Sequence, residues 1–382
     1  MMPVKGFRDF TEEEALKREK IKEIIIKKFK TYGFEPAETP IIEYEDFAKK
    51  EQFEETISEI FKLKDRGKRN LALRYELTFQ LKRIAKNKKL PYRRYQIGEV
   101  FRDEPISANR FRQFTQCDID VVGSTIRDEA EILKIFSEIL EELKIDATIV
   151  INNRKLLDEI LEEQGIEKQN REKVIKELDK LNKLSEAEVK ENLKKFNAEK
   201  LIEIVKKPKK FFEKYSAFKE IKELLKYCKI FKVKVKFLPS LARGLAYYNG
   251  NIFEIFTKKM KESIAGGGSY LIEKIQSTGI SFGLERLSSL AKVQVEGVKC
   301  LIISIGQEKE AIELAQKLRK KQISCFVMDK IYKAVEYANA KKIPYVIFVG
   351  KKELEKEKFK LRDMKTGEEK LLTLNKLLEF LS

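Results

Sequence analysis

Two strand-like segments, residues 92–102 and 112–122, constrain the fold of this chain most strongly. A polar loop that contains Pro105 separates them. Such a pair predicts a β-hairpin with a long connection. Because long loops in compact domains usually carry function or lack order, residues 103–111 are a candidate part of a site.

Helix and strand patterns surround this hairpin. Apolar residues at helical spacing predict a helix over residues 12–32 that stops at Gly33, and Pro36 and Pro40 exclude a helix just after it. Five further elements are predicted: a strand at 70–74 running into a helix from about 77, a helix over 127–143, a strand in DATIVINN, and a strand in KVKVKFLP, which alternates with period 2.

The composition of the chain changes twice along its length. Residues 154–227 are rich in Leu, Lys and Glu, with almost no glycine, and predict a small helical insertion. Beyond a boundary near 292–298, strand and helix patterns alternate to the C-terminus. We therefore expect a first domain over 1–293, with the insertion at about 154–227, and an α/β module with a parallel-rich sheet over 298–382.

The chain contains no histidine, and this limits its chemistry. Ser-His-Asp and Cys-His catalysis are excluded, as is any histidine-ligated metal. None of the four cysteines forms a C-x-x-C pair, which argues against a zinc site. Any reaction must therefore use carboxylates, arginines, tyrosines or groups of the substrates themselves.

The net charge of +18 predicts a polyanionic partner, because lysine and arginine gain free energy on phosphates through counterion release. A lysine-rich surface without such a partner would also account for this charge. The N-terminus has no apolar signal region, and no run of about 18 apolar residues occurs. A cytoplasmic protein with reduced thiols is the expectation.

A cluster of arginine, glutamate and phenylalanine at the hairpin loop predicts a nucleotide site. Arg102 and Glu104 end the first strand, and Arg110, Arg112 and Phe114 start the second. A guanidinium suits phosphate, a carboxylate can accept from an exocyclic amine, and an aromatic ring can stack on a base. The alternative is a surface hairpin whose charges face water.

Three further motifs have both a functional and a structural interpretation. Arg286 begins a helix after a strand and could hold distal phosphates, or it could lie on a solvated helix face. Glu76 and Thr78 near a strand end could receive an ammonium group, or they could cap a helix. The glycines of residues 265–270 permit close approach of a ligand to the backbone, or simply a strand and turn.

Taken together, these motifs resemble those of class II aminoacyl-tRNA synthetases. FRDE followed by RFRQF resembles motif 2, GISFGLERL resembles motif 3, and the helix with YGFEPAETP resembles motif 1. LARGLAYYNGNIFE and SIAGGGSY are similar to the two signature peptides of histidyl-tRNA synthetases. The resemblance implies an α+β catalytic domain on an antiparallel sheet, with a helical insertion, and a C-terminal α/β anticodon-binding domain.

The resemblance also implies an activity, which is that of a histidine–tRNA ligase. Such an enzyme activates L-histidine with ATP to histidyl-adenylate and pyrophosphate, and then transfers histidine to the 3′ end of tRNA(His). The implied cofactors are ATP and Mg²⁺, with the metal ligands left open. The implied partners are tRNA(His) and a second copy of the chain, bound through the motif 1 region.

Roles for individual residues follow from their positions in these motifs. The resemblance implies that Arg102 and Arg243 are catalytic and lie on either side of the reacting phosphorus. It implies ATP contacts from Arg102, Glu104, Arg110, Phe114 and Arg286. It implies histidine contacts from Glu76, Leu77, Thr78, Arg102, Gln116, Asp120, Arg243, Tyr247 and Tyr248.

The chain departs from the family pattern at several positions. Ala246 and Leu271 stand where these synthetases usually have Asp, Ser269 where they have Arg, and Tyr75 where they have Pro. We expect that the Asp and Arg at 246 and 269 form an ion pair in relatives and were lost together, since losing both partners can be nearly neutral. Asp120, in place of Glu, suggests an archaeal-like pattern.

A catalytically inactive synthetase paralogue that acts as a regulatory or RNA-binding subunit is the alternative. Such paralogues generally lose the signature arginine and the anticodon domain. This chain keeps Arg102, Arg243, Arg286 and the C-terminal module. The enzyme is therefore the favoured interpretation.

Overall fold

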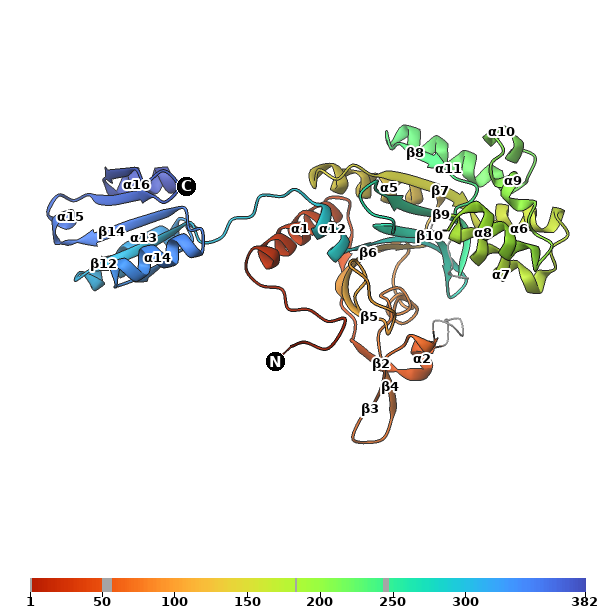
Figure 1. Ribbon diagram of the computed structural model, residues 1–382, viewed down its shortest axis with the longest axis horizontal. Helices are drawn as coiled ribbons and strands as arrows, with labels where there is room; N and C mark the ends of the chain where they lie inside the picture. Colours follow the sequence, from red (N-terminus) through yellow and green to blue (C-terminus); the bar gives the residue numbers. More distant parts are fainter. Residues whose placement is uncertain (1, 50–56, 183, 243–246) are drawn as a thin grey trace. The chain divides into compact units, whose positions relative to one another are not determined.

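The computed structural model describes residues 2–49, 57–182, 184–242 and 247–382 (Figure 1). Arg243 and Ala246, two positions singled out in the sequence, lie outside these ranges. The chain divides into two compact units, one of residues 1–10 and 17–293 and one of residues 11–16 and 294–382. Separate clusters of buried apolar side chains stabilise the two units.

An eight-stranded sheet forms the centre of the first unit, among its described residues. The strand order is β1-β5-β6-β11-β10-β9-β7-β8. The outer pairs β1/β5 and β7/β8 are parallel, and the other neighbours are antiparallel. The bounds are β1 Glu35–Pro36, β5 Tyr92–Phe101, β6 Gln113–Val122, β7 Thr148–Asn153, β8 Val235–Phe237, β9 Tyr248–Phe256, β10 Ala265–Ile272 and β11 Ile275–Gly283.

The hairpin expected from the sequence is confirmed as β5 and β6, which pair from Tyr92↔Val122 to Phe101↔Gln113. Arg102, Glu104 and Arg110 belong to the connection rather than to the strands. The prediction that they end or start the strands was therefore wrong by one to three residues. Position in a loop frees their side chains from the strict alternation of a strand.

The two faces of β6 have different surroundings because strand side chains alternate. Cys117, Ile119 and Val121 are fully buried in the main apolar core. Gln116, Asp118 and Asp120 point to the opposite face, where they line a cavity. This alternation separates the core that stabilises the domain from the polar face that can bind a ligand.

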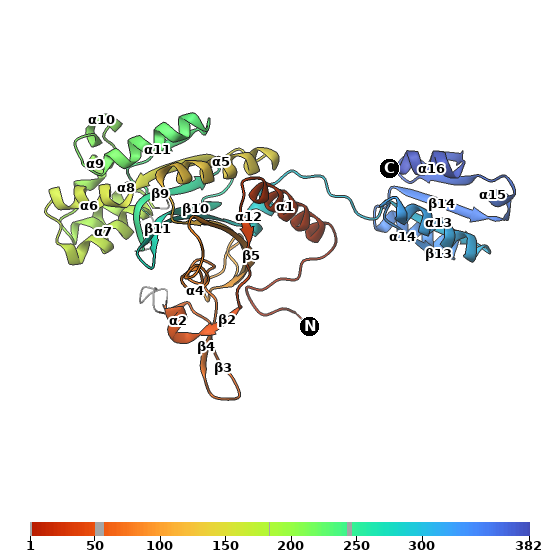
Figure 2. The same cartoon turned by 180° about the vertical axis from the view of Figure 1, so that it is seen from behind.

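Helices cover the apolar face of the sheet. Figures 1 and 2 show α5 (Ile126–Glu142) and α11 (Phe218–Ile230) alongside one another, and residues of α1 (Glu12–Thr31) and α12 (Leu284–Leu290) join the same core. The predicted helices over 12–32 and 127–143 are confirmed as α1 and α5. A capping box of Thr125 and Asp128 fixes the start of α5.

A smaller three-stranded sheet, of order β2-β4-β3, precedes the hairpin. Its strands are β2 Ile42–Tyr44, β3 Lys62–Lys64 and β4 Asn70–Leu73, and α2 (Glu45–Lys49) packs beside it. The predicted strand at 70–74 is thus confirmed. The helix predicted from about residue 77 is wrong in its start, because α4 covers only Leu81–Ile84. The Glu76 carboxylate accepts from the amides of Thr78 and Phe79 and holds this segment in a turn.

Short helices make up most of residues 154–230. They are α6 Arg154–Glu163, α7 Lys168–Asp179, the 3₁₀ turn η1 Lys180–Asn182, α8 Glu186–Lys194, α9 Leu201–Val205, α10 Lys209–Phe212, and α11. Their apolar faces join the main core, for example through Phe212 and Phe218. No helix among the described residues is long and apolar enough to cross a membrane.

The second unit is a five-stranded sheet, of order β13-β12-β14-β15-β16, with helices on both faces. Its elements are β12 Cys300–Ile305, α13 Glu308–Lys320, β13 Cys325–Met328, α14 Ile331–Ala340, β14 Tyr345–Gly350, α15 Lys351–Glu355, β15 Phe359–Asp363, β16 Glu369–Leu372 and α16 Leu374–Leu381. The expectation of a parallel-rich sheet holds only for β13-β12-β14, because β14, β15 and β16 pair antiparallel. β15 and β16 form a hairpin, and Gly367, whose φ is 77°, lies in the tight turn between them.

Candidate active site

Two adjoining cavities lie on the polar face of the large sheet. Arg102, Gln116, Gly266 and Ser281 line both. The first cavity is completed by the 103–111 loop, the segment 263–265 and the start of α12. The second is completed by residues 75–79, the end of β6, and tyrosines from the segment 247–248 and from β10. A ligand could therefore extend from one cavity into the other.

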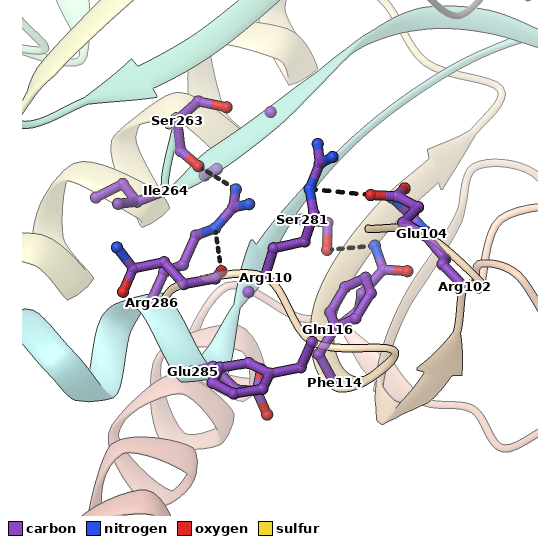
Figure 3. Close-up of a pocket in the computed structure, with 15 residues that line it drawn as sticks. Arg102, Glu104, Arg110, Phe114, Gln116, Ser263, Ile264, Ser281, Glu285 and Arg286 are labelled. Carbon is purple, nitrogen blue, oxygen red and sulfur yellow. Dashed lines mark hydrogen bonds and ion pairs between the residues drawn. The ribbon is translucent and has the colours of Figure 1, made fainter. Parts of the chain in front are cut away.

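Three arginines converge on the first cavity (Figure 3). Nη1 of Arg286 donates to the Ser263 carbonyl at 2.6 Å, and Nε of Arg110 lies 3.0 Å from the Glu104 carboxylate. Burial lowers the pKa of Arg286, and the like charges of Arg110 and Arg102 lower it further. A polyanion bound here would relieve this repulsion.

The Arg102 guanidinium lies over two aromatic rings. Its central carbon is 4.3 Å from the centroid of Tyr75 and 5.1 Å from that of Phe114. Its Nε donates to the Tyr75 carbonyl at 3.2 Å. Tyr75, which replaces the proline usual in the resembled family, thus contacts Arg102 directly. These contacts fix the guanidinium at the junction of the two cavities.

Carboxylates and tyrosines dominate the second cavity. Asp118 and Asp120 form its floor, Glu76 and Thr78 lie at one side, and the rings of Tyr247, Tyr248 and Tyr270 contact one another at the wall. Burial raises the pKa of Glu76 and that of Asp118 to about 7. The cavity is therefore suited to a small ligand with cationic or N–H groups.

Asp120 is held from three sides. Arg94 Nη2 lies 2.7 Å from its Oδ2, and the Tyr270 hydroxyl donates to its Oδ1. Gly279 lies opposite on β11, where an added Cβ would come within 2.1 Å of Oδ1. Arg94, Asp118 and Tyr270 did not stand out in the sequence. Only the alternation in CDIDVV, which places Asp118 and Asp120 on one face, could have indicated part of this cluster.

The departure at Ser269 falls on a buried polar network. The Ser269 hydroxyl donates to one oxygen of Glu129, and Asn251 donates to the other at 2.7 Å. Burial raises the pKa of Glu129 to about 7. Glu129 is thus satisfied by a neutral hydroxyl and an amide from the described residues. Leu271, at another position that departs from the family pattern, is half exposed on β10.

The structure brings most of the residues singled out in the sequence into these cavities. The first is lined by Arg102, Glu104, Arg110, Phe114 and Arg286. The second is lined by Glu76, Thr78, Arg102, Gln116, Asp120, Tyr247 and Tyr248. Leu77 is fully buried and offers only its carbonyl, to Arg94, and Arg243 lies outside the described residues. Arg112 pairs with Asp103 at 3.0 Å and does not line either cavity.

Comparisons with known proteins agree with this geometry. Residues 6–287 match the histidyl-tRNA synthetase family, and residues 299–382 match an anticodon binding domain. Histidine–tRNA ligase 1 of Bacillus cereus is 35% identical, and the match covers 99% of this chain and 96% of that protein. Histidine–tRNA ligase 2 of Shouchella clausii is 34% identical, with 96% of each chain covered.

Solved structures give the same result for the fold. The crystal structure of histidyl-tRNA synthetase from Nostoc sp. is similar with a TM-score of 0.87 and 26% identity, over 100% of this chain and 98% of that one. These relatives are bacterial, so they give no support to the archaeal-like pattern inferred from Asp120. The α+β fold with its helical insertion and C-terminal α/β domain, expected from the sequence, is confirmed. The chain belongs to the histidyl-tRNA synthetase family.

Proposed function

We propose that the two cavities bind ATP and L-histidine and that the chain joins histidine to tRNA(His). The convergence of Arg102, Arg110 and Arg286 beside a cavity of carboxylates and tyrosines carries this proposal. Family membership supports a histidine–tRNA ligase, and the geometry supports one division of labour among the described residues.

We assign ATP to the first cavity on the chemistry of its lining residues. Phe114 stacks on the adenine, and Glu104 accepts from its amino group. Arg110 and Arg286 bind the distal phosphates as fork-shaped cations. Arg110 also pairs with Glu104 at 3.0 Å, which places the base-binding carboxylate next to one of the phosphate-binding cations.

Histidine fits the second cavity beside it. Glu76 and Thr78 receive the α-ammonium group, and Arg102 receives the carboxylate at the junction. Asp120 accepts from one imidazole nitrogen, and a tyrosine hydroxyl from Tyr247 or Tyr248 donates to the other. Gln116, which also lines the cavity, adds an amide near the ring. One acceptor and one donor in the cavity thus match the N–H and the unprotonated nitrogen of a neutral imidazole.

The first step needs no general base, because the substrate carboxylate is already ionised at neutral pH. One carboxylate oxygen attacks the α-phosphorus, the new O–P bond forms, and the bond to pyrophosphate breaks. Arg102 neutralises the developing charge on the phosphoryl oxygens. We assign the opposite side of the phosphorus to Arg243. In the second step the 3′ hydroxyl of the terminal tRNA adenosine attacks the adenylate carbonyl, the new ester C–O bond forms, and the bond to AMP breaks, with the hydroxyl proton passing to the departing AMP phosphate.

Class II synthetases use Mg²⁺ with ATP, and the described residues offer it few dedicated ligands. In the part of the chain that the structure describes, no group of three or more Cys, Asp or Glu side chains is arranged to hold a metal. Glu285, one of the carboxylates that line the first cavity, accepts from the Thr115 amide and pairs with Arg18 at 2.9 Å. We therefore expect Mg²⁺ to arrive on the triphosphate.

The basic charge of the chain and its second unit are the features that we assign to tRNA binding. The net charge of +18 suits a polyanion, and we assign anticodon binding to residues 298–382. We place the activity in the cytoplasm, where tRNA is charged.

A second copy of the chain is the proposed partner of the motif 1 segment. Ile41, Ile42 and Tyr44 are exposed by 43%, 50% and 59%, which is unusual for three large apolar side chains so close together. Covering them in a homodimer removes this surface from water. Light scattering should give twice the 44.8 kDa mass of the chain, and a mass of one chain would contradict the dimer.

Pyrophosphate exchange into ATP, measured with each amino acid in turn, tests the function. We expect exchange that depends on histidine alone. Absence of exchange with every amino acid would instead support the inactive paralogue. Exchange with a different amino acid would contradict the assignment of the second cavity.

A further inference from the structure

Arg94 is the largest fully buried side chain in the described chain, and it lies directly beneath the second cavity. It belongs to β5, where its register partner on β6 is Asp120. It does not line the cavity and so cannot contact a ligand there. A buried guanidinium is costly unless it is paired, which raises the question of what it does.

A single nitrogen of Arg94 contacts both the 76–78 segment and Asp120. Nη2 donates to the Leu77 carbonyl at 2.8 Å and lies 2.7 Å from Oδ2 of Asp120. Leu77 stands between Glu76 and Thr78, the two residues assigned to the ammonium group. Arg94 therefore joins the segment that receives the amino group to the carboxylate that receives the imidazole.

The remaining contacts leave Asp120 little freedom to move. The Tyr270 hydroxyl donates a hydrogen bond to Oδ1 of Asp120. Gly279 packs against the same oxygen, since a Cβ at that position would lie 2.1 Å from it. Nε and Nη1 of Arg94 find no hydrogen-bond partner among the described residues. The ion pair with Asp120 is thus the main interaction that offsets the desolvation cost of the buried Arg94 guanidinium.

We propose that Arg94 is a positioning residue for histidine recognition, which holds Asp120 as an oriented carboxylate and fixes the Leu77 peptide. This inference rests on the proposed function of the second cavity. Arg94 would act on the affinity for histidine and leave the ATP cavity unaffected. If the ion pair only stabilised the sheet, replacing Arg94 would not weaken histidine binding selectively over ATP binding.

The charge of Arg94 gives the proposal a pH signature. Burial raises the pKa of Asp120, while Arg94 and then the Tyr270 hydrogen bond lower it. The other ionisable groups that face it are Glu76 and Asp118, and the charge of Asp120 raises the pKa of both. Removing Arg94 leaves only the Tyr270 hydrogen bond to oppose the effect of burial, so the pKa of Asp120 rises further. Asp120 then binds a proton at higher pH and ceases to be an anionic acceptor for the imidazole N–H.

The test compares Arg94→Met and Arg94→Lys with the unaltered chain by histidine-dependent pyrophosphate exchange. We expect Arg94→Met to raise KM for histidine by about tenfold or more, while KM for ATP stays within about twofold. Lysine keeps the charge but not the fork, and should give a smaller rise. The ratio of variant to unaltered KM for histidine should fall as the pH rises from about 6 to about 9.

A double substitution separates positioning from folding. In an Asp120→Asn background, Arg94→Met should have little further effect on KM for histidine, because its target is gone. An undiminished effect there, equal rises in the two KM values, or a ratio that does not change with pH would overturn the proposal. Arg94→Lys keeps the test valid if the methionine variant does not fold. If the unaltered chain itself shows no histidine-dependent exchange, the proposed function fails rather than the role of Arg94.

Discussion

Replacing Arg102 by alanine should lower the rate of histidine-dependent pyrophosphate exchange by about 10²–10³-fold. Among the described residues, Arg102 is the cation that lines both cavities, at the junction where the proposed carboxylate and α-phosphate meet. Its contacts with the rings of Tyr75 and Phe114 hold it there before the substrates bind. The fall should appear mainly in kcat, because the charge it stabilises develops in the transition state.

Two further variants show whether the loss is specific. Arg102→Lys keeps the charge but loses the planar fork and the stacking, so we expect it to recover only part of the rate. Arg69→Ala removes an arginine from the exposed β3–β4 hairpin, where it pairs with Asp65, and should leave exchange unchanged. A kcat of Arg102→Ala within a few-fold of the unaltered value would show that another group carries the reaction.

Gly267→Ala should destabilise the catalytic unit by about 3 kcal/mol, near the upper end of the usual cost of overpacking. Gly267 lies in β10, between β9 and β11. A Cβ there would lie 2.0 Å from the Gly279 carbonyl oxygen and 2.6 Å from the Ile280 Cα. Both atoms belong to the backbone of β11, so no side chain can move aside to make room.

Calorimetric unfolding provides the measurement, with Gly67→Ala as the matched control. Gly67 is exposed, and a Cβ there would meet its nearest neighbour, an Asp65 carboxylate oxygen, at an ordinary 3.4 Å. We expect a lowered transition temperature for Gly267→Ala and almost none of this change for Gly67→Ala. Equal transition temperatures in the two variants would show that the sheet can relax around an added methyl group.

Sequence patterns predicted the elements that are long and clearly bounded. The hairpin β5/β6 and the helices α1 and α5 have strong periodicity and clear ends, and their positions followed from local sequence. The helix predicted from residue 77 failed because a side-chain interaction decided its start. Glu76 accepts two backbone amides there and makes a turn, which helix periodicity does not report.

Much of the candidate site was predictable because the catalytic motifs lie on a few local segments. Arg94 was not, although it stands next to Arg93 in the sequence. Arg93 pairs with Asp128 and Glu131 on α5, while Arg94 points to the opposite face of β5 and is completely buried. Two adjacent arginines look alike until the register of the sheet is known. Leu77 was likewise ambiguous, since it contributes a carbonyl rather than a side chain.

The lack of histidine has a consequence for how this protein exchanges protons with its surroundings. Burial raises the pKa of Glu76, of Asp118 and of Glu129 to about 7, and a hydrogen bond with Cys300 lowers the pKa of Cys325 to about 7. Near neutrality these buried carboxyl groups can therefore exchange protons, and two of them, Glu76 and Asp118, line the second cavity. On the proposed assignment of Glu76 to the substrate ammonium group, an incoming cation favours the ionised form of Glu76, so that substrate binding and proton release become a single linked equilibrium.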